Sequence, residues 1–347
     1  MENLITLKDL KKAGLINVKD MKALRPVAEN YAIAITPYMR TRIDPTDKND
    51  PIRQQFVPHI SETYHLDEEL ADPIGDKIHS PVLGIVHRYK NRAILKVVNL
   101  CAVYCRFCFR RETVGHEKGG VLDIKTLTRA LAYIANTPQL TEIILTGGDP
   151  FILSPEQIKN LTIQLTNIPH IKNIRWHTRI PIVKPECVSQ ELVKALKFTD
   201  CKVRVAIHAN HANEFSNQTR TACQKLRKVG IELLSQSVLL RGINDDVQTL
   251  IDLFHAYESI DAAPYYLHHC DLARGTAHFR TTLAKGIQLM SILKQCLPSK
   301  QIPSYILDVP GGIGKVHISS KNVICLRQGL YNIRLKNGSL TTYRDRL

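Results

Sequence analysis

The spacing of hydrophobic residues changes near residue 90, and the change separates two kinds of predicted structure. Before it, Leu7, Leu10 and Leu15 fall on one side of a short helix, and a second helix is predicted over 18–32. Prolines then interrupt any long element; they are Pro37, Pro45, Pro51, Pro58, Pro73 and Pro81. This pattern predicts a mostly helical accessory segment over 1–85 that packs against the rest of the chain.

From residue 90 onward, short apolar runs alternate with helical patterns. Runs typical of buried parallel strands cover 93–98, 142–146, 173–177, 202–208, 231–238 and 262–267. Between them, Ser154, Pro155 and Gln157 form an N-cap and capping box, and Asp245 precedes a second amphipathic helix. Six strand–helix units predict an α/β fold whose parallel sheet closes, fully or partly, into a barrel over 86–297.

Polar and reactive side chains follow these strands. In parallel sheets, ligands bind beyond the carboxyl ends of the strands. A cysteine run follows the first strand and the sequence Thr-Gly-Gly-Asp-Pro follows the second, while Gln236 and the segment 268–271 lie at the ends of the fifth and sixth. Gly147 and Gly148 would let backbone amides approach a ligand closely, or they would simply form a tight turn.

The cysteine run has the most specific spacing in the chain. Cys101, Cys105 and Cys108 form a C-x₃-C-x₂-C pattern, with Phe107 directly before the last cysteine. Thiolates at such spacing can hold a [4Fe–4S] cluster, and three of them leave one iron open to an outside ligand. A structural zinc would need a fourth protein ligand, and three unrelated thiols in a reducing compartment are the remaining alternative.

A glycine-rich stretch near the C-terminus carries a second candidate. The sequence from Asp308 to Val316 reads Asp-Val-Pro-Gly-Gly-Ile-Gly-Lys-Val, and valines at both outer positions exclude a Walker A phosphate loop. What remains is Lys315 on an arm near the barrel mouth. Lysine forms Schiff bases with carbonyl ligands when its amine is neutral, although a lysine by itself is more often a surface residue.

Composition adds bounds on size and surroundings. The 347 residues, 44% hydrophobic and 23% charged, suit a globular protein with one large domain and an appendage. Nine cysteines without paired spacing, no secretory signal and no long apolar run predict a cytoplasmic protein that contacts no membrane. The net charge of +15 is spread without a basic block, which favours anionic cofactors and a solvated surface over nucleic acid.

Several separate strings together resemble the lysine 2,3-aminomutase family of radical S-adenosyl-L-methionine (SAM) enzymes, including the shorter paralogues associated with elongation factor P. The likeness covers roughly residues 70–345. The strings are 87–92 (HRYKNR), the cysteine run with Arg110 and Arg111, 146–149 (TGGD), 178–182 (TRIPI), 236–245 (QSVLLRGIND), Tyr265 with Tyr266, Cys270 with Asp271, and 308–315.

The resemblance implies a radical SAM partial (βα)₆ barrel with a helical N-terminal segment and a C-terminal arm, 298–347, that binds pyridoxal 5′-phosphate (PLP). A [4Fe–4S] cluster would bind Cys101, Cys105 and Cys108. SAM would lie near Gly147, Gly148, Asp149, Gln236 and Phe107. Lys315 would be the catalytic lysine that holds PLP, Arg92 and Arg88 would meet its phosphate, and Tyr89 would lie against its ring.

The substrate implied by the resemblance is L-lysine. Arg110 would bind its carboxylate, and Asp271 and Asp308 would bind its distal ammonium, an arrangement that disfavours glutamate because like charges repel. The implied reaction is the 2,3-amino migration that gives β-lysine through a 5′-deoxyadenosyl radical, in a homo-oligomer served by a reducing electron donor. Asp246 stands where longer members have a cysteine that helps to bind an intersubunit metal, so the sequence leaves that metal and the oligomeric state open.

Three alternatives differ in the role of the chain. The enzyme could supply β-lysine for elongation factor P rather than for catabolism. A radical SAM enzyme acting on RNA would explain the charge of +15 and would bind RNA in a salt-sensitive way. A non-enzymatic cluster protein would bind iron without consuming SAM.

Overall fold

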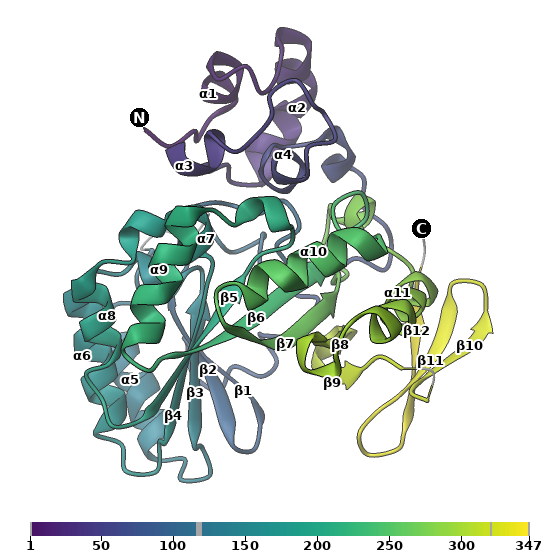
Figure 1. Cartoon of the computed structure of the whole chain (residues 1–347). Coiled ribbons are helices and arrows are strands. Elements are labelled where there is room, and N and C mark those ends of the chain that lie inside the picture. The colour runs from purple at the N-terminus through teal and green to yellow at the C-terminus, as the bar shows by residue number, and fades with distance from the viewer. Residues whose placement is uncertain (1, 116–119, 320, 346–347) are drawn as a thin grey trace.

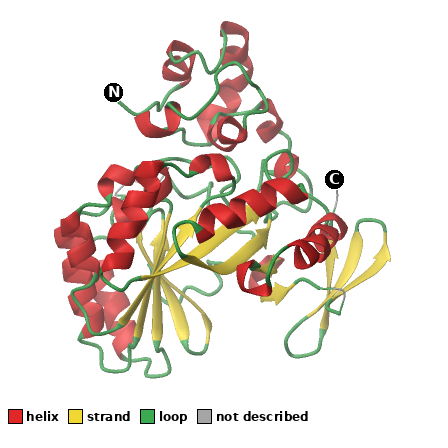
Figure 2. Cartoon of the chain, in the orientation of Figure 1, coloured by secondary structure: helices red, strands yellow, loops and turns green. Residues whose placement is uncertain are grey.

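The structure is a computed structural model that describes residues 2–115, 120–319 and 321–345. Helices cover the outside of a curved sheet, and a small second sheet stands beside it (Figures 1 and 2). The α-helices are α1 (Leu7–Lys12), α2 (Val18–Asn30), α3 (Pro37–Arg40), α4 (Pro51–Phe56), α5 (Ile124–Ala135), α6 (Pro155–Thr166), α7 (Ile180–Val183), α8 (Gln190–Leu196), α9 (Asn217–Lys228), α10 (Val247–Glu258) and α11 (Leu283–Cys296). Short 3₁₀ helices include η1 (Ile60–Thr63), η4 (Ala212–Glu214) and η7 (Pro310–Gly312).

The main sheet runs in the order β1 to β9 along the chain. Its strands are β1 (Ile85–Tyr89), β2 (Arg92–Val98), β3 (Glu142–Gly147), β4 (Asn173–Thr178), β5 (Lys202–His208), β6 (Glu232–Leu239), β7 (Ala262–His269), β8 (Ser304–Val309) and β9 (Gly314–His317). Strands β2 to β8 pair in parallel, and β1 and β9 pair antiparallel at the two edges. The six predicted parallel strands are confirmed as β2 to β7, and the barrel is a partial one.

Alternation along the strands divides the inside of the barrel from the outside. On β4, Ile174 and Trp176 are fully buried in the core, while Arg175 and His177 line a central cavity. Successive side chains of a strand point to opposite faces of the sheet. Each parallel strand therefore supplies an apolar face to the helices and a second face to the cavity.

Side-chain caps fix the starts of helices α6 and α10. Ser154 caps α6, its side chain accepting a bond from the Gln157 amide, as predicted. Helix α10 is capped by Asp246, which accepts from the Thr249 amide at 2.9 Å, whereas Asp245 accepts from the Gly242 amide at 2.8 Å. Asp245 precedes this helix, as the sequence predicted, but it closes the preceding turn, and its neighbour Asp246 provides the cap.

The N-terminal helices α1 to α4 lie together over one end of the barrel (Figure 1). The N-terminal segment contacts the loop after β2 that carries Cys101, Cys105 and Cys108, called the cysteine loop below. The Arg106 amide donates to the Gln55 carbonyl at 2.8 Å, and the Tyr104 amide donates to the Ala34 carbonyl at 3.1 Å. A further bond joins the Thr36 hydroxyl to the Val183 carbonyl at 2.6 Å. The accessory segment is therefore part of the surroundings of the cysteines.

The last part of the chain forms two different structures. Strands β8 and β9 extend the barrel sheet, and β10 (Val323–Arg327), β11 (Leu330–Arg334) and β12 (Leu340–Arg344) form a separate antiparallel sheet that the sequence did not predict. The Leu283 amide donates to Asp345 at 2.6 Å and ties this small sheet to α11. The division of the chain at residues 85 and 297 into an N-terminal segment, a barrel and a C-terminal arm stays a prediction.

Across the described ranges, no helix is both long and apolar enough to cross a membrane.

Candidate active site

A cavity of about 290 Å³ lies inside the curve of the main sheet. Its wall includes residues from β1 to β9, from the cysteine loop and from the turn after β11. Every residue that the sequence assigned to the site lines it: Arg88, Tyr89, Arg92, Cys101, Cys105, Phe107, Cys108, Arg110, Gly147, Gly148, Asp149, Gln236, Asp271, Asp308 and Lys315. The structure thus brings these side chains together, and their individual roles remain predictions.

The three cysteines form a partition between this cavity and a smaller one on the side of the N-terminal segment. All three are free thiols. Burial raises the pKa of Cys108 to about 11 and raises the pKa of Cys101 and Cys105 as well. A coordinating metal removes such protons outright, so the donor set fits a thiolate-bound metal group.

The cysteines do not form the kind of site that holds one ion. Within the described ranges, no set of three His, Cys, Asp or Glu side chains is placed to hold a single metal ion. In an iron–sulfur cube each thiolate binds a different iron, so the sulfurs need not converge on one point. Three thiols in one loop therefore suit a cluster with one open iron, whereas a structural zinc would need a fourth protein ligand.

Two glycines at the end of β3 let the cysteine loop approach the sheet. A Cβ added to Gly148 would lie 2.0 Å from the Leu100 carbonyl oxygen, and one added to Gly147 would lie 2.3 Å from the Val98 oxygen. The Gly148 amide donates to the Val98 carbonyl at 2.5 Å. The sequence predicted that these glycines let a ligand approach the backbone closely. In these contacts, the group that approaches Gly147 and Gly148 is instead the backbone at the end of β2 and the start of the cysteine loop.

Asp149 is held by several donors of its own chain. Its carboxylate accepts from the Thr178 hydroxyl at 2.7 Å, the Arg179 amide at 2.7 Å and the Phe151 amide at 3.0 Å. Burial raises the pKa of this carboxyl despite these bonds. Asp149 therefore fixes the ends of β3 and β4 relative to each other, next to the cysteine loop.

Lys315 lies on β9 opposite Asp308 on β8, because the two residues are direct partners across this antiparallel pair. Its ammonium forms an ion pair with Asp308, and its amide donates to the Tyr89 hydroxyl at 3.0 Å. The side chain is 30% exposed, which leaves the amine accessible from the cavity. The residue is not a free surface lysine.

The glycine-rich turn before Lys315 is packed against the segment 73–79. His79 donates from Nε2 to the Gly312 carbonyl at 2.7 Å, and the Gly311 amide donates to the Pro73 carbonyl at 3.2 Å. Gly75 and Gly312 approach so closely that a Cβ on Gly75 would lie 2.6 Å from the Gly312 Cα. The predicted arm is therefore a bonded strand pair and turn at the cavity wall.

Asp271 and Asp308 both line the cavity, and their pKa values are shifted in opposite directions. Burial and the negative charge of Asp308 raise the pKa of Asp271 to about 8. Burial would raise the pKa of Asp308 too, but the Lys315 ammonium and His268, whose Nδ1 lies 3.3 Å from Asp308 Oδ2, outweigh it and hold that pKa below its ordinary value. Asp271 Oδ1 is buried without a hydrogen-bond partner among the described residues. The pair can accept a cation.

Positive charge gathers at Tyr89. Arg92 lies over its ring with Cζ 5.1 Å from the centroid, and Lys336 Nζ lies 5.9 Å away. The buried Nε atoms of Arg88 and Arg92 have no hydrogen-bond partner within the described part of the chain. Unsatisfied guanidinium donors of this kind fit an anion such as a phosphate. Arg92 begins β2, so this group sits away from the carboxyl edge where the sequence placed the site.

The remaining predicted residues lie between these groups. Arg110 Nε pairs with Asp76 at 2.8 Å, and although burial opposes it, this pairing holds the pKa of Asp76 below its ordinary value. Phe107 stands edge-on to Phe279, with ring centroids 6.1 Å apart. Gln236 Oε1 is buried without a partner among the described residues, which leaves an acceptor free for a ligand.

Sequence reasoning missed several residues of the cavity wall, including Arg175, His177 and Lys336. Burial, followed by the charge of Arg175, lowers the pKa of His177 well below its ordinary value, so this ring is neutral. The alternation of β4 could have identified Arg175 and His177. Lys336 belongs to no pattern, and only the fold brings it to the site.

Comparison with known proteins places the chain among radical SAM proteins. The model of the "Radical SAM superfamily" matches residues 95–254. L-lysine 2,3-aminomutase of Clostridium subterminale is 35% identical over 340 residues, 98% of this chain and 81% of that protein. L-lysine 2,3-aminomutase of Escherichia coli K12 is 35% identical over 300 residues, 86% of this chain and 87% of that protein.

A solved radical SAM methyltransferase from Sphaerobacter thermophilus is similar over 64% of this chain, with a TM-score of 0.44 and 16% identity. That likeness is too distant to bear on the site.

Proposed function

Because the chain belongs to the lysine 2,3-aminomutase family, and so is a radical SAM isomerase, we propose that it converts L-lysine to β-lysine by moving the amino group from C2 to C3. The observation that carries this proposal is the shared cavity. Cys101, Cys105 and Cys108 line the same cavity as Lys315 and as two carboxylates suited to an ammonium group.

The residues of the chain fit the cofactors of this chemistry. When bound, a [4Fe–4S] cluster with SAM supplies the radical, and PLP supplies the group on which amino migration becomes feasible. Cys101, Cys105 and Cys108 would hold the cluster, and Lys315 would hold PLP through its amine. The unsatisfied donors of Arg88 and Arg92 support a phosphate contact there.

A second group of residues, Gly147, Gly148, Asp149, Gln236 and Phe107, would line the SAM pocket. The free acceptor of Gln236 and the aromatic face of Phe107 are suited to a nucleoside. Asp149 would act by fixing the wall of this pocket, since its carboxylate is already bonded within the chain.

Charge at the other end of the cavity favours a lysine substrate. The Lys315 ammonium pairs with Asp308, so this carboxylate accepts a primary ammonium. Asp271 offers a second carboxylate with a free buried oxygen, and Arg110 would meet the substrate carboxylate. A cation taken out of water needs such opposite charge, whereas the carboxylate of a glutamate side chain would be repelled.

The chain would also exclude water from the reacting atoms. The packed glycine turn directly precedes Lys315 of the cavity wall, and the N-terminal segment is hydrogen-bonded to the cysteine loop. Enclosure of this kind suppresses side reactions of a radical. A low-potential electron donor, a cytoplasmic location and a homo-oligomer complete the proposal, and the nine free cysteines suit a reducing compartment.

The proposal is tested by following one nitrogen atom. The anaerobically iron-loaded protein is incubated with PLP, SAM, dithionite and L-lysine labelled with ¹⁵N at the α-amino group and ¹³C at C3. We expect a new ¹⁵N–¹³C coupling by NMR, its absence with Lys315→Ala, and no turnover of L-glutamate. Consumption of SAM without that coupling would contradict the proposal.

A further inference from the structure

We propose that Arg179 tunes the reduction potential of the cluster by donating a hydrogen bond to the sulfur of Cys105, and that Glu214 sets the strength of this effect by partly neutralising Arg179. The proposal rests on the proposed function in one respect: it takes the three cysteines to hold an iron–sulfur cluster. Arg179 would be a positioning residue that acts through a cluster ligand.

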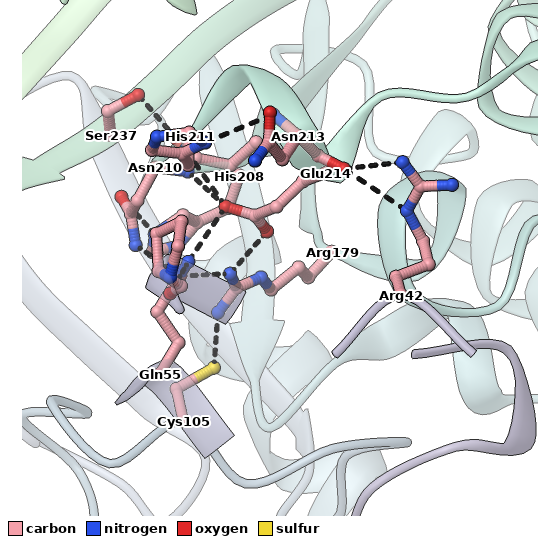
Figure 3. A network of polar contacts seen from close by, with 12 residues as sticks. Arg42, Gln55, Cys105, Arg179, His208, Asn210, His211, Asn213, Glu214 and Ser237 are labelled. Carbon is pink, nitrogen blue, oxygen red and sulfur yellow. Dashed lines mark hydrogen bonds and ion pairs between the residues drawn. The ribbon is translucent and has the colours of Figure 1, made fainter. Parts of the chain in front are cut away.

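The geometry places one guanidinium nitrogen on the sulfur. Arg179 follows β4, and its Nη1 donates to Cys105 Sγ at 2.7 Å (Figure 3). The side chain is 6% exposed. Its backbone amide is fixed at 2.7 Å by the carboxylate of Asp149, the residue that also joins the ends of β3 and β4. Both the backbone and the tip of Arg179 are therefore held in place beside the cysteine loop.

The other terminal nitrogen is held just as firmly. Arg179 Nη2 donates to Glu214 Oε2 at 2.6 Å and to Gln55 Oε1 at 2.5 Å. Glu214 is fully buried, and its second oxygen accepts the amides of Asn210 at 2.7 Å and His211 at 3.0 Å. Gln55 belongs to α4 of the N-terminal segment. As Figure 3 shows, the arginine bridges this segment and the sheet, and it cannot turn away from Cys105 without breaking buried bonds.

Aromatic rings exclude water from the guanidinium. Its Cζ lies 4.7 Å from the centroid of Phe56 and 5.5 Å from that of Phe107. A charge shielded from water acts more strongly on its neighbours than an exposed one. The positive charge of Arg179 and the negative charge of Glu214 therefore both act on the sulfur of Cys105 with little screening.

Reduction adds one electron to a cluster that already carries three thiolates. Hydrogen bonds and positive charge at a ligating sulfur stabilise the added electron and raise the reduction potential. Without Arg179, the potential should fall. Without the charge of Glu214, the arginine would be less neutralised and the potential should rise.

The two substitutions thus have opposite predicted signs, which a merely structural role would not produce. Loosening of the site by either change would move the potential in one common direction. The string from Thr178 to Ile182, to which the sequence alone assigned no role, acquires one through Arg179.

The test is a redox titration of the full chain, reconstituted anaerobically with iron and sulfide and without SAM, followed by the EPR signal of the reduced cluster. The variants are Arg179→Gln, Arg179→Lys and Glu214→Gln. The matched control is Arg280→Gln, because Arg280 is also a buried arginine and pairs with Glu69 at 2.6 Å. Unlike Arg179, it donates no hydrogen bond to a cysteine among the residues that the structure describes. Iron and sulfide content are measured first in each protein.

At the wild-type midpoint we expect Arg179→Gln to lower the ratio of reduced to oxidised cluster about tenfold, equivalent to ~59 mV for one electron. Arg179→Lys should show a smaller shift of the same sign, Glu214→Gln a shift of opposite sign, and Arg280→Gln none. If Arg179→Gln takes up no iron, Arg179→Lys and Glu214→Gln still decide the matter by the signs of their shifts.

An unchanged midpoint in Arg179→Gln, or shifts of the same sign in the arginine and Glu214 variants, would overturn the role of Arg179 while leaving the aminomutase assignment intact. A wild-type chain that forms no cluster at all would overturn both.

Discussion

Asp271 and Asp308 carry the same side chain, yet their surroundings push their pKa values in opposite directions. Asp308 has a bonded cation, Lys315, and Asp271 has burial and a neighbouring negative charge. At neutral pH one carboxyl is ionised and the other protonated. Binding of an ammonium group beside Asp271 must therefore release its proton.

This proton release gives binding a predictable pH dependence. The pKa of Asp271 is about 8, above its ordinary value of 3.8, so its charged form is present above pH 8 and is lost as the pH falls. Below pH 8 we expect the Kd for L-lysine to rise by roughly tenfold per pH unit, because only the ionised carboxylate holds the cation. Isothermal titration between pH 6 and 8.5 measures this, with Asp271→Asn as the reference, since it should bind weakly and lack the same slope. Parallel curves for the two proteins would contradict the assignment of Asp271.

Lys315 gives a second test at the scale of one residue. Lys315→Ala should lose the PLP absorbance that borohydride removes from the wild type, while its iron content stays unchanged, because the amine and the thiols lie on different parts of the wall. Lys336→Ala serves as the control. It should keep the covalent link and weaken PLP binding by about tenfold, the effect of one charge-assisted contact. Loss of PLP from Lys336→Ala, with retention in Lys315→Ala, would reverse the assignment.

Among single residues, the sequence predicted those that belong to a pattern. Cys101, Cys105 and Cys108 follow from spacing, and Lys315 from the glycines beside it and from the family resemblance. Lys336 reaches the cavity only through the fold, since neither the spacing nor the composition around it differs from that of surface residues. Arg179 was seen as part of a string, but its contact with Cys105 depends on where β4 ends.

At the scale of elements, the N-terminal segment holds the cysteine loop through a buried carboxylate. Glu62 on η1 accepts Arg106 Nε at 3.0 Å and also pairs with Arg111, and both arginines lie within or next to the cysteine run. Burial opposes ionisation of Glu62, but the two arginines hold its pKa below its ordinary value of 4.5. Its contribution to stability is therefore present above pH 4.5 and is lost as the pH falls through that lowered value.

Removing this carboxylate charge should be costly. We expect Glu62→Gln to lower the free energy of unfolding by about 3–5 kcal/mol, because two buried arginines lose their counter-charge. The control Glu29→Gln removes one partner of the exposed ion pair with Arg25. It should change the free energy of unfolding by less than about 1 kcal/mol. Urea unfolding at pH 7 compares the two. Equal effects would show that Glu62 is not the anchor of the loop.

The turn after β3 is a second element on which the cluster site depends. Gly148→Ala would place a Cβ 2.0 Å from the Leu100 carbonyl oxygen, and a backbone atom cannot yield as a flexible side chain can. We therefore expect severalfold less iron per chain after anaerobic reconstitution. Gly230→Ala is the matched control, because its added Cβ meets nothing within 4 Å and only the positive φ of 78° is strained, so it should lose some stability and keep its iron. Full iron loading of Gly148→Ala would contradict this account of the turn.

Periodicity predicted the elements that have one buried face. Strands β2 to β7 are apolar toward the helices, and α6 carries a complete capping box, so both were visible in the sequence. Strand β10 has one buried residue followed by four exposed ones, and such a strand shows no apolar alternation. The cap of α10 could not be chosen from the sequence, because Asp245 and Asp246 are adjacent and chemically alike, and only the geometry shows which one caps the helix.

At the scale of the whole molecule, the partial barrel, the N-terminal helices and the β8–β9 pair meet at one cavity. The sequence predicted a sheet that is closed or partly closed. The barrel is partial, because β1 and β9 end the sheet at its two edges. Alternation cannot reveal this, because closure depends on which strands become neighbours. The charge of +15 is also redistributed by folding, since Arg106, Arg179 and Arg280 are buried in ion pairs rather than displayed on a surface.

The proposed function requires that one cavity receives both the cluster and PLP. An anaerobic crystal structure of the protein loaded with iron, SAM and PLP, with anomalous data at the iron edge, tests it most directly. We predict iron peaks at Cys101, Cys105 and Cys108 and pyridoxyl density joined to Lys315, both within the cavity of the main sheet. Iron bound elsewhere, or PLP joined to a lysine outside that cavity, would rule out the proposed aminomutase site.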